Sequence, residues 1–86
     1  MQIKYTKSAV KVINSLDKVM KIRMKNSIEG LTEVPPRGDI KQIQGFNSSL
    51  YRLRVGKFRV LYEYIKIDGE QVLLVKEIGS RGDIYK

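Results

Sequence analysis

The 86-residue sequence contains no cysteine, no histidine and no tryptophan. Without cysteine there can be no disulfide framework and no thiol nucleophile. Without cysteine and histidine together, the usual zinc sites and histidine-mediated acid–base catalysis are also excluded. We therefore expect no metal site and no cofactor, and any chemistry must come from other side chains.

Long apolar runs are missing as well. No stretch approaches the ~18 residues that a membrane-spanning helix needs, and the first residues lack the apolar segment and cleavage site of a secretory signal. Hydrophobic residues make up 42% of the chain and charged residues 30%, values that are ordinary for a globular protein. We expect one domain over residues 1–86 and a cytoplasmic location.

Positive charge is the most distinctive feature of the composition. Seventeen lysines and arginines against nine acidic residues give a net charge of +8. The excess is spread over both halves of the chain, which indicates a basic folded surface rather than a detachable basic tail. Such a surface favours nucleic acid, an anionic membrane or an acidic protein as partner, and charge alone does not choose among them.

Two prolines divide the chain into a helical half and a strand half. Before Pro35 and Pro36, the apolar spacing predicts a short strand over 2–5, a helix over 8–16 and a second helix that begins after Asp17 as N-cap and ends near Gly30. After them, patterns typical of strands cover 40–44, 50–55, 58–65 and 71–78. We therefore expect an α+β fold, with the N-terminal strand and a helical hairpin packed on one face of a small antiparallel sheet and the other face open.

Gly56 and Lys57 form a two-residue gap with glycine first, which is typical of a type II′ hairpin turn. If they are the loop, Val55 lies opposite Phe58, and Arg54 lies opposite Arg59. Apolar residues then gather on one face of the hairpin, while the opposite face carries the three arginines of the two strands: Arg52, Arg54 and Arg59.

Three guanidiniums on one small face repel one another, and arginine cannot lose its proton to relieve the repulsion. Glu63 lies on the same face and could pair with one of them, but not with all three. The cluster therefore indicates a site for a phosphodiester, which planar guanidiniums bind bidentately. The alternative is a set of ordinary solvated arginines on a strand.

Asp68 and Gly69 are the expected type I′ turn of the next hairpin. A regular ladder from that turn pairs Arg59 with Ile78 and directs the following residues towards the arginines. Arg81 and Tyr85 then become neighbours of Arg54, and the Tyr85 phenol could stack on a base or orient a ribose hydroxyl. Equally, Tyr85 could be a terminal aromatic that packs the tail on the core.

The segments 51–63 and 78–85, read as YRLRVGKFRVLYE and IGSRGDIY, resemble the RelE/ParE superfamily of toxins from type II toxin–antitoxin systems. The order of elements agrees over essentially the whole chain, including the segment 39–45 before the central strand. The resemblance to the RelE-like branch implies a ribosome-dependent mRNA endonuclease that cuts mRNA in the A site of the 30S subunit. It also implies a neutralising antitoxin as partner, besides the mRNA and ribosomal RNA.

The resemblance places the catalytic and RNA-binding residues on the same hairpin face. RelE carries lysine where this chain has Arg52 and Arg54, and many relatives carry histidine where it has Ser80, so the phosphate clamp is better supported than the proton transfers. The predicted catalytic residues are Arg54, Arg59, Arg81 and Tyr85, and the predicted phosphate-binding residues are Arg52, Arg54, Lys57 and Lys76.

Two other functions remain open from the sequence. A ParE-like toxin would have the same fold but would inhibit DNA gyrase through protein contacts without cutting RNA. A nucleic-acid-binding module without enzymatic activity is the third reading.

Overall fold

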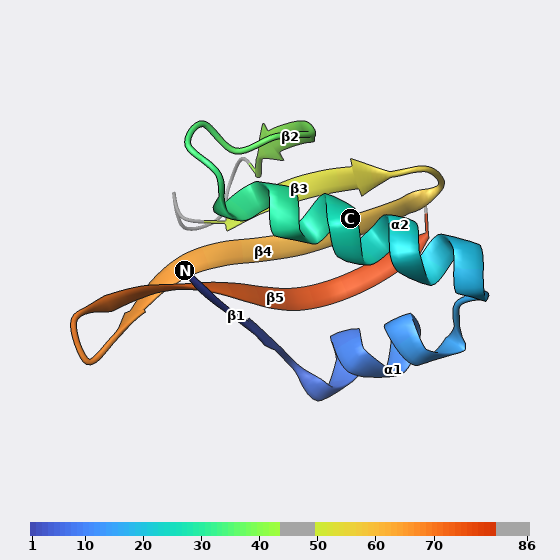
Figure 1. The fold of residues 1–86 in the computed structure, drawn as a ribbon, viewed down its shortest axis with the longest axis horizontal. Helices are drawn as coiled ribbons and strands as arrows, with labels where there is room; N and C mark the ends of the chain where they lie inside the picture. The colour runs from blue at the N-terminus through green and yellow to red at the C-terminus, as the bar shows by residue number, and fades with distance from the viewer. Residues whose placement is uncertain (44–49, 81–86) are drawn as a thin grey trace.

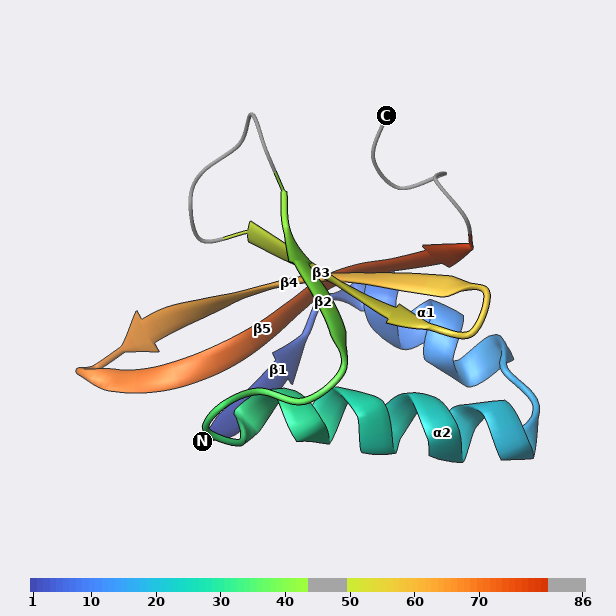
Figure 2. The same cartoon turned by 90° about the horizontal axis from the view of Figure 1, so that it is seen from above.

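The computed structural model describes residues 1–43 and 50–80, which form two helices and a five-stranded sheet. Figure 1 shows α2 in front of the sheet and α1 below β5, and Figure 2 shows that both helices lie on the same side of the sheet. The elements in chain order are β1 (Gln2–Tyr5), α1 (Lys7–Ser15), α2 (Lys18–Glu29), a short 3₁₀ helix η1 (Gly30–Thr32), β2 (Asp39–Gln42), β3 (Leu50–Val55), β4 (Phe58–Ile67) and β5 (Glu70–Ser80).

The strand order is β1-β5-β4-β3-β2. Strands β2 to β5 are antiparallel neighbours, whereas β1 joins the edge parallel to β5. The sheet is therefore mixed rather than purely antiparallel. The chain begins at the β1 edge, passes through the two helices to β2 at the opposite edge, and comes back across the sheet to place β5 beside β1. The predicted α+β architecture is confirmed.

Both helices begin at side chains that cap their first turns. The Oγ of Thr6 accepts a hydrogen bond from the backbone N–H of Ala9 at 3.2 Å, and Oδ1 of Asp17 accepts one from Met20 at 2.8 Å. These caps satisfy backbone donors that have no partner within the helix. The prediction of Asp17 as the N-cap of α2 is confirmed.

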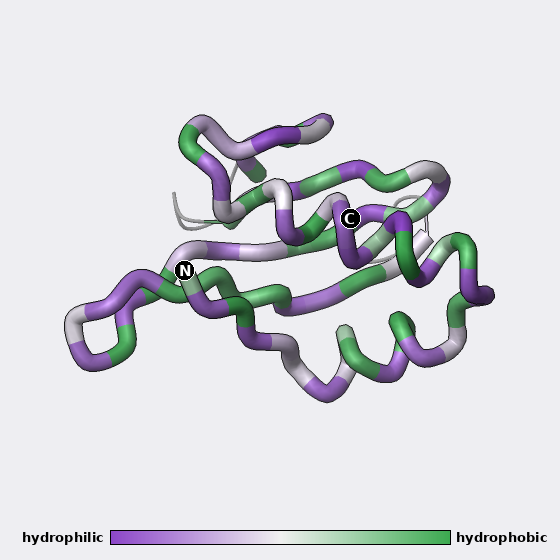
Figure 3. Tube along the Cα trace, in the orientation of Figure 1, coloured by the Kyte–Doolittle hydropathy of each residue, from purple (hydrophilic) through white to green (hydrophobic). Residues whose placement is uncertain are grey.

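The core lies between the helices and one face of the sheet. Met24, Ile28 and Leu31, which form an apolar stripe at helical spacing, have no exposed surface. They pack with inward-facing strand residues that include Leu53 and Val60. Figure 3 shows green hydrophobic segments recurring along both the helices and the strands. None of the helices described is long and apolar enough to cross a membrane.

The β3–β4 hairpin has the predicted register. Val55 pairs with Phe58, Leu53 with Val60 and Tyr51 with Tyr62. Gly56 has a φ of +60°, and Lys57 has no positive φ, which agrees with the predicted type II′ turn. Arg54 pairs directly with Arg59, as the turn alone predicts.

The β4–β5 hairpin departs from the predicted register. Asp68 and Gly69 have φ values of 53° and 83°, as a type I′ turn requires, and the ladder is regular as far as the pair Tyr62–Val75. An irregularity between Leu61 and Tyr62 then shifts the pairing by one residue, so Arg59 pairs with Gly79 and not with Ile78. The prediction was wrong there because it assumed a ladder without a bulge.

Candidate nucleic-acid interface

The arginine patch, which consists of Arg52, Arg54 and Arg59, lies on the face of the sheet away from the helices. The pairing of Arg54 with Arg59 places two guanidinium-bearing residues opposite one another on β3 and β4. On the other side of β3, Arg54 pairs with Asp39, the first residue of β2. Three neighbouring strands therefore carry one acidic and two basic residues in a row across the sheet.

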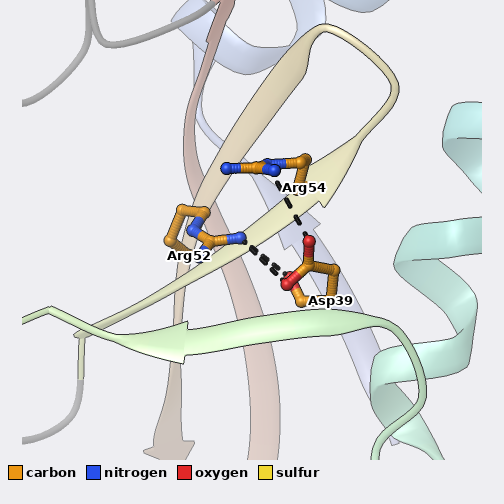
Figure 4. Close-up of polar contacts among 3 residues, drawn as sticks. All are labelled: Asp39, Arg52 and Arg54. Carbon is orange, nitrogen blue, oxygen red and sulfur yellow. Dashed lines mark hydrogen bonds and ion pairs between the residues drawn. The ribbon is translucent and has the colours of Figure 1, made fainter.

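Asp39 contacts two members of the arginine patch (Figure 4). Nη1 of Arg52 donates to the backbone carbonyl of Asp39 at 3.1 Å and lies 3.4 Å from its Oδ1. Nε of Arg54 lies 3.8 Å from Oδ2 of the same carboxylate, a longer ion pair. One carboxylate thus offsets part of the charge of three arginines, and the patch keeps a surplus of positive charge.

The sequence did not single out Asp39 as a counter-ion. The short strand β2 is joined to β3 by residues 43–49, so turn chemistry did not set its register. Glu63 is the acidic residue that the sequence placed on this face, and its carboxylate forms an ion pair of 3.1 Å with Lys76. The sequence did show an acidic residue directly before the predicted strand at 40–44. Only the pairing of β2 with β3 shows that this residue lies beside the arginines.

The members of the arginine patch differ in exposure. The Arg52 side chain is only 8% exposed, while half of the Arg54 side chain is exposed. Arg59 is intermediate. Arg54 and Arg59 are therefore the residues of the patch that can meet an external anion, and the burial of Arg52 favours a supporting role over direct phosphate contact.

The two predicted phosphate-binding lysines lie in different surroundings. Lys57 is exposed in the β3–β4 turn, with its ammonium nitrogen 5.6 Å from the centre of the Phe58 ring. Lys76 lies in β5 at the register shift and has its charge compensated by Glu63. Because Phe58 packs against the core, the Lys57 ammonium lies towards the helix side of the turn and not beside Arg59.

A cleft beside Arg54 widens the basic surface around the edge of the sheet. Its volume is about 310 Å³. Its walls come from three parts of the chain, which are the end of α2, the segment that precedes β2, and strand β3. Arg54 contributes positive charge to it, the charge of Arg37 is offset by an ion pair of 2.7 Å with Glu33, and Asn26 and Ser27 contribute neutral polar groups. This mixture of charged and polar groups suits a polar anionic ligand such as a nucleotide unit.

Arg81 and Tyr85 lie outside the described residues, so their predicted approach to the arginine patch stays a prediction. Strand β5 ends at Ser80, which pairs with Phe58 next to Arg59. Within residues 1–43 and 50–80, no three acidic side chains come together as a metal site would require.

The fold and the arginine patch define a small basic α+β protein with a cluster of arginines on the sheet face away from the helices. Comparison with known proteins gives its family. A family model described as the ParE toxin of the type II toxin–antitoxin system parDE matches residues 3–85. A protein of Methanocaldococcus jannaschii named as toxin RelE1 is 33% identical over 67 residues, which are 74% of this chain and 71% of the relative.

Solved structures agree with the sequence relatives. RelE in the archaeal RelE–RelB complex from Pyrococcus horikoshii has a TM-score of 0.74 and 30% identity, over 95% of this chain and 96% of that one. The YoeB/ParE toxin from Agrobacterium tumefaciens shares the fold, with a TM-score of 0.78 and 18% identity over 94% and 99% of the two chains. The chain belongs to the RelE/ParE superfamily of type II toxin–antitoxin toxins.

Proposed function

We propose that this toxin is an mRNA endonuclease of the RelE-like branch, which cuts mRNA in the A site of the ribosome and so stops translation. The observation that carries the proposal is the direct pairing of Arg54 with Arg59 on the sheet face away from the helices. A ribosome-bound phosphodiester is an anion that these two guanidiniums can bind together. The RelE relatives at 30% and 33% identity support the choice of branch.

The simplest chemistry uses the ribose 2′-hydroxyl as the nucleophile. Its oxygen attacks the adjacent phosphorus as its proton passes to a base, the bond to the 5′-oxygen breaks, the 5′-oxygen takes up a proton, and a 2′,3′-cyclic phosphate and a 5′-hydroxyl remain. Negative charge grows on the phosphate oxygens in the transition state, where Arg54, Arg59 and Arg81 would stabilise it as preorganised cations. Tyr85 would stack on a base or orient the ribose hydroxyl.

The chain supplies few groups that could serve as a general base. Arginine is permanently protonated, and histidine is missing. Positioning of the substrate by the ribosome would therefore contribute a large part of the rate. We therefore expect the toxin to need the ribosome and not to cut free RNA.

A cognate antitoxin completes the proposal. The Pyrococcus horikoshii relative was solved as a complex of RelE with RelB. The net charge of +8 suits a partner with an acidic segment that covers the arginine patch and competes with RNA for it.

The test is cleavage of mRNA on programmed ribosomes by the wild type and by Arg54→Ala, Arg59→Ala, Arg81→Ala and Tyr85→Phe. We expect the loss of Arg54 or Arg59 to slow cleavage about 100- to 1,000-fold, the usual effect of removing one transition-state donor. Lys66→Ala is the matched control, because it removes one positive charge from the exposed far end of β4. Wild-type cleavage by the arginine variants would contradict the assignment.

A ParE-like inhibitor of DNA gyrase is the second candidate, and the match of a ParE family model to residues 3–85 favours it. Gyrase supercoiling assays with the same variants separate the two functions. Inhibition of supercoiling by a wild-type protein that leaves ribosome-bound mRNA intact would establish the second candidate.

A further inference from the structure

We propose that Asp39 is the positioning residue of the arginine patch, which fixes the direction of the Arg54 guanidinium towards the scissile phosphate. The inference rests on the proposed function and assigns a role to a residue outside the predicted site. The juxtaposition that carries it is one carboxylate whose two oxygens face two different arginines, one buried and one exposed (Figure 4).

Arg52 anchors the carboxylate from within the protein. Its side chain is 8% exposed, and its Nη1 contacts both the carbonyl and Oδ1 of Asp39. A buried guanidinium cannot shed its charge, so it needs a nearby acceptor. Its Nε is buried and has no partner among the described residues, which leaves Asp39 as the acceptor that the structure gives it.

Arg54 is held from one side only. The contact of 3.8 Å joins its Nε to Oδ2 of Asp39, and no other polar partner of Arg54 is present in the described part of the chain. The outer nitrogens of the guanidinium extend past the carboxylate in Figure 4. They form the edge with which arginine binds a phosphate bidentately.

The cross-strand pairing sets the backbone positions from which these side chains extend. Asp39 and Arg54 are direct partners between β2 and β3, and Arg54 is in turn the partner of Arg59. The carboxylate, held by Arg52, therefore lies where it limits the rotamers of a long, half-exposed side chain. A catalytic cation that is already oriented loses less conformational entropy when the phosphate arrives.

The negative charge of Asp39 gives the role a distinctive kinetic signature. A carboxylate next to a phosphate site weakens the binding of RNA by repulsion, although it orients the arginine that acts in the transition state. Removing the charge should therefore lower kcat without raising KM. A residue that only stabilises the fold would not separate the two constants in this way.

The experiment measures kcat and KM for mRNA cleavage on programmed ribosomes with Asp39→Asn, Asp39→Glu and Asp68→Asn. We expect Asp39→Asn to lower kcat about 10- to 100-fold, the scale of a misplaced catalytic group, with KM unchanged or lower. Asp39→Glu, which keeps the charge, should recover at least half of this loss on a logarithmic scale. Asp68→Asn removes the same charge at the β4–β5 turn, where an asparagine tolerates the positive φ, and should behave as the wild type.

A double-mutant cycle separates positioning from stability. In an Arg54→Ala background, Asp39→Asn should cost no further activity, because the side chain that it orients is gone. A further loss in that background, a rise in KM in place of a fall in kcat, or wild-type kcat in Asp39→Asn would each overturn the inference.

Failure of the proposed function would be visible separately, as a wild type that cuts no ribosome-bound mRNA. NMR of the Arg54 Nε–H group in the free protein would then test whether Asp39 orients the Arg54 side chain. We expect its signal to shift and sharpen in Asp39→Asn and to stay in place in Asp68→Asn. An unchanged signal in Asp39→Asn would overturn the positioning role, whatever reaction the protein catalyses.

Discussion

Gly38 shows how a single residue places the candidate site. It has a φ of +126°, in the left-handed region that residues with a side chain rarely adopt. It directly precedes Asp39, so its backbone sets where β2 begins. A Cβ at this position would lie 2.6 Å from Cδ1 of Leu53, a buried core residue. Both the backbone and the space around it therefore require glycine.

Gly38→Ala should lower the free energy of unfolding by about 2–4 kcal/mol, because it adds a steric clash to the strain of a positive φ. Gly69→Ala is the matched control, since its φ is +83° and nothing lies within 4 Å of the added Cβ. Urea unfolding of the two variants separates strain from clash. Equal losses at the two positions would show that contact with Leu53 has no effect.

The bulge in β5 shows how an element keeps its hydrophobic side in the core. Leu73 and Val75 face the core at the spacing of a regular strand, but the next core residue is Ile78, three positions on. A regular ladder would have turned Ile78 away and brought Glu77 inward. The register shift restores the pairing of Ile78 with Val60. The spacing of two and then three residues was visible in the sequence.

Substitution at two neighbouring residues tests this register. Ile78→Ala should cost about 2–5 kcal/mol of unfolding free energy, as expected for a large-to-small change in the core. Glu77→Ala, which pairs with Leu61 on the other face, should change it by less than about 1 kcal/mol. Thermal and urea unfolding measure both. The reverse order would support the regular ladder.

In the molecule as a whole, the helices cover one face of the sheet and form the core with it. The other face is not covered by the helices and carries the arginine patch. A cluster of three tyrosines joins sheet and helices on the core side. The rings of Tyr51 and Tyr62 stack with their centres 5.6 Å apart, and the Tyr64 hydroxyl donates to the carbonyl of Leu31 at 2.7 Å. Burial raises the pKa of Tyr62 above its ordinary value, and the neighbouring tyrosines raise it further. Burial also raises the pKa of Tyr64.

The raised pKa values predict a loss of stability in alkali. Above about pH 10 the tyrosines of the unfolded chain lose their protons while the buried ones keep theirs, so the unfolding free energy falls as pH rises. Each such tyrosine contributes a slope of at most about 1.4 kcal/mol per pH unit. Tyr62→Phe should reduce the slope between pH 10 and 11.5 in urea unfolding, without changing the contribution of the lysines. The same slope in wild type and variant would contradict the assignment.

Local chemistry alone determined most of the elements and one decisive pairing. Capping at Asp17, the apolar stripe of α2 and the Gly56–Lys57 turn depend on neighbours in sequence, so the helices and the pairing of Arg54 with Arg59 followed from the sequence. Long-range packing decided the rest. The β5 bulge depends on which side chains the helices cover, and the contacts of Asp39 depend on the register of β2, which no tight turn sets. Only the folded chain therefore distinguishes the buried arginine from the exposed one, because burial is a property of the surroundings and not of the residue.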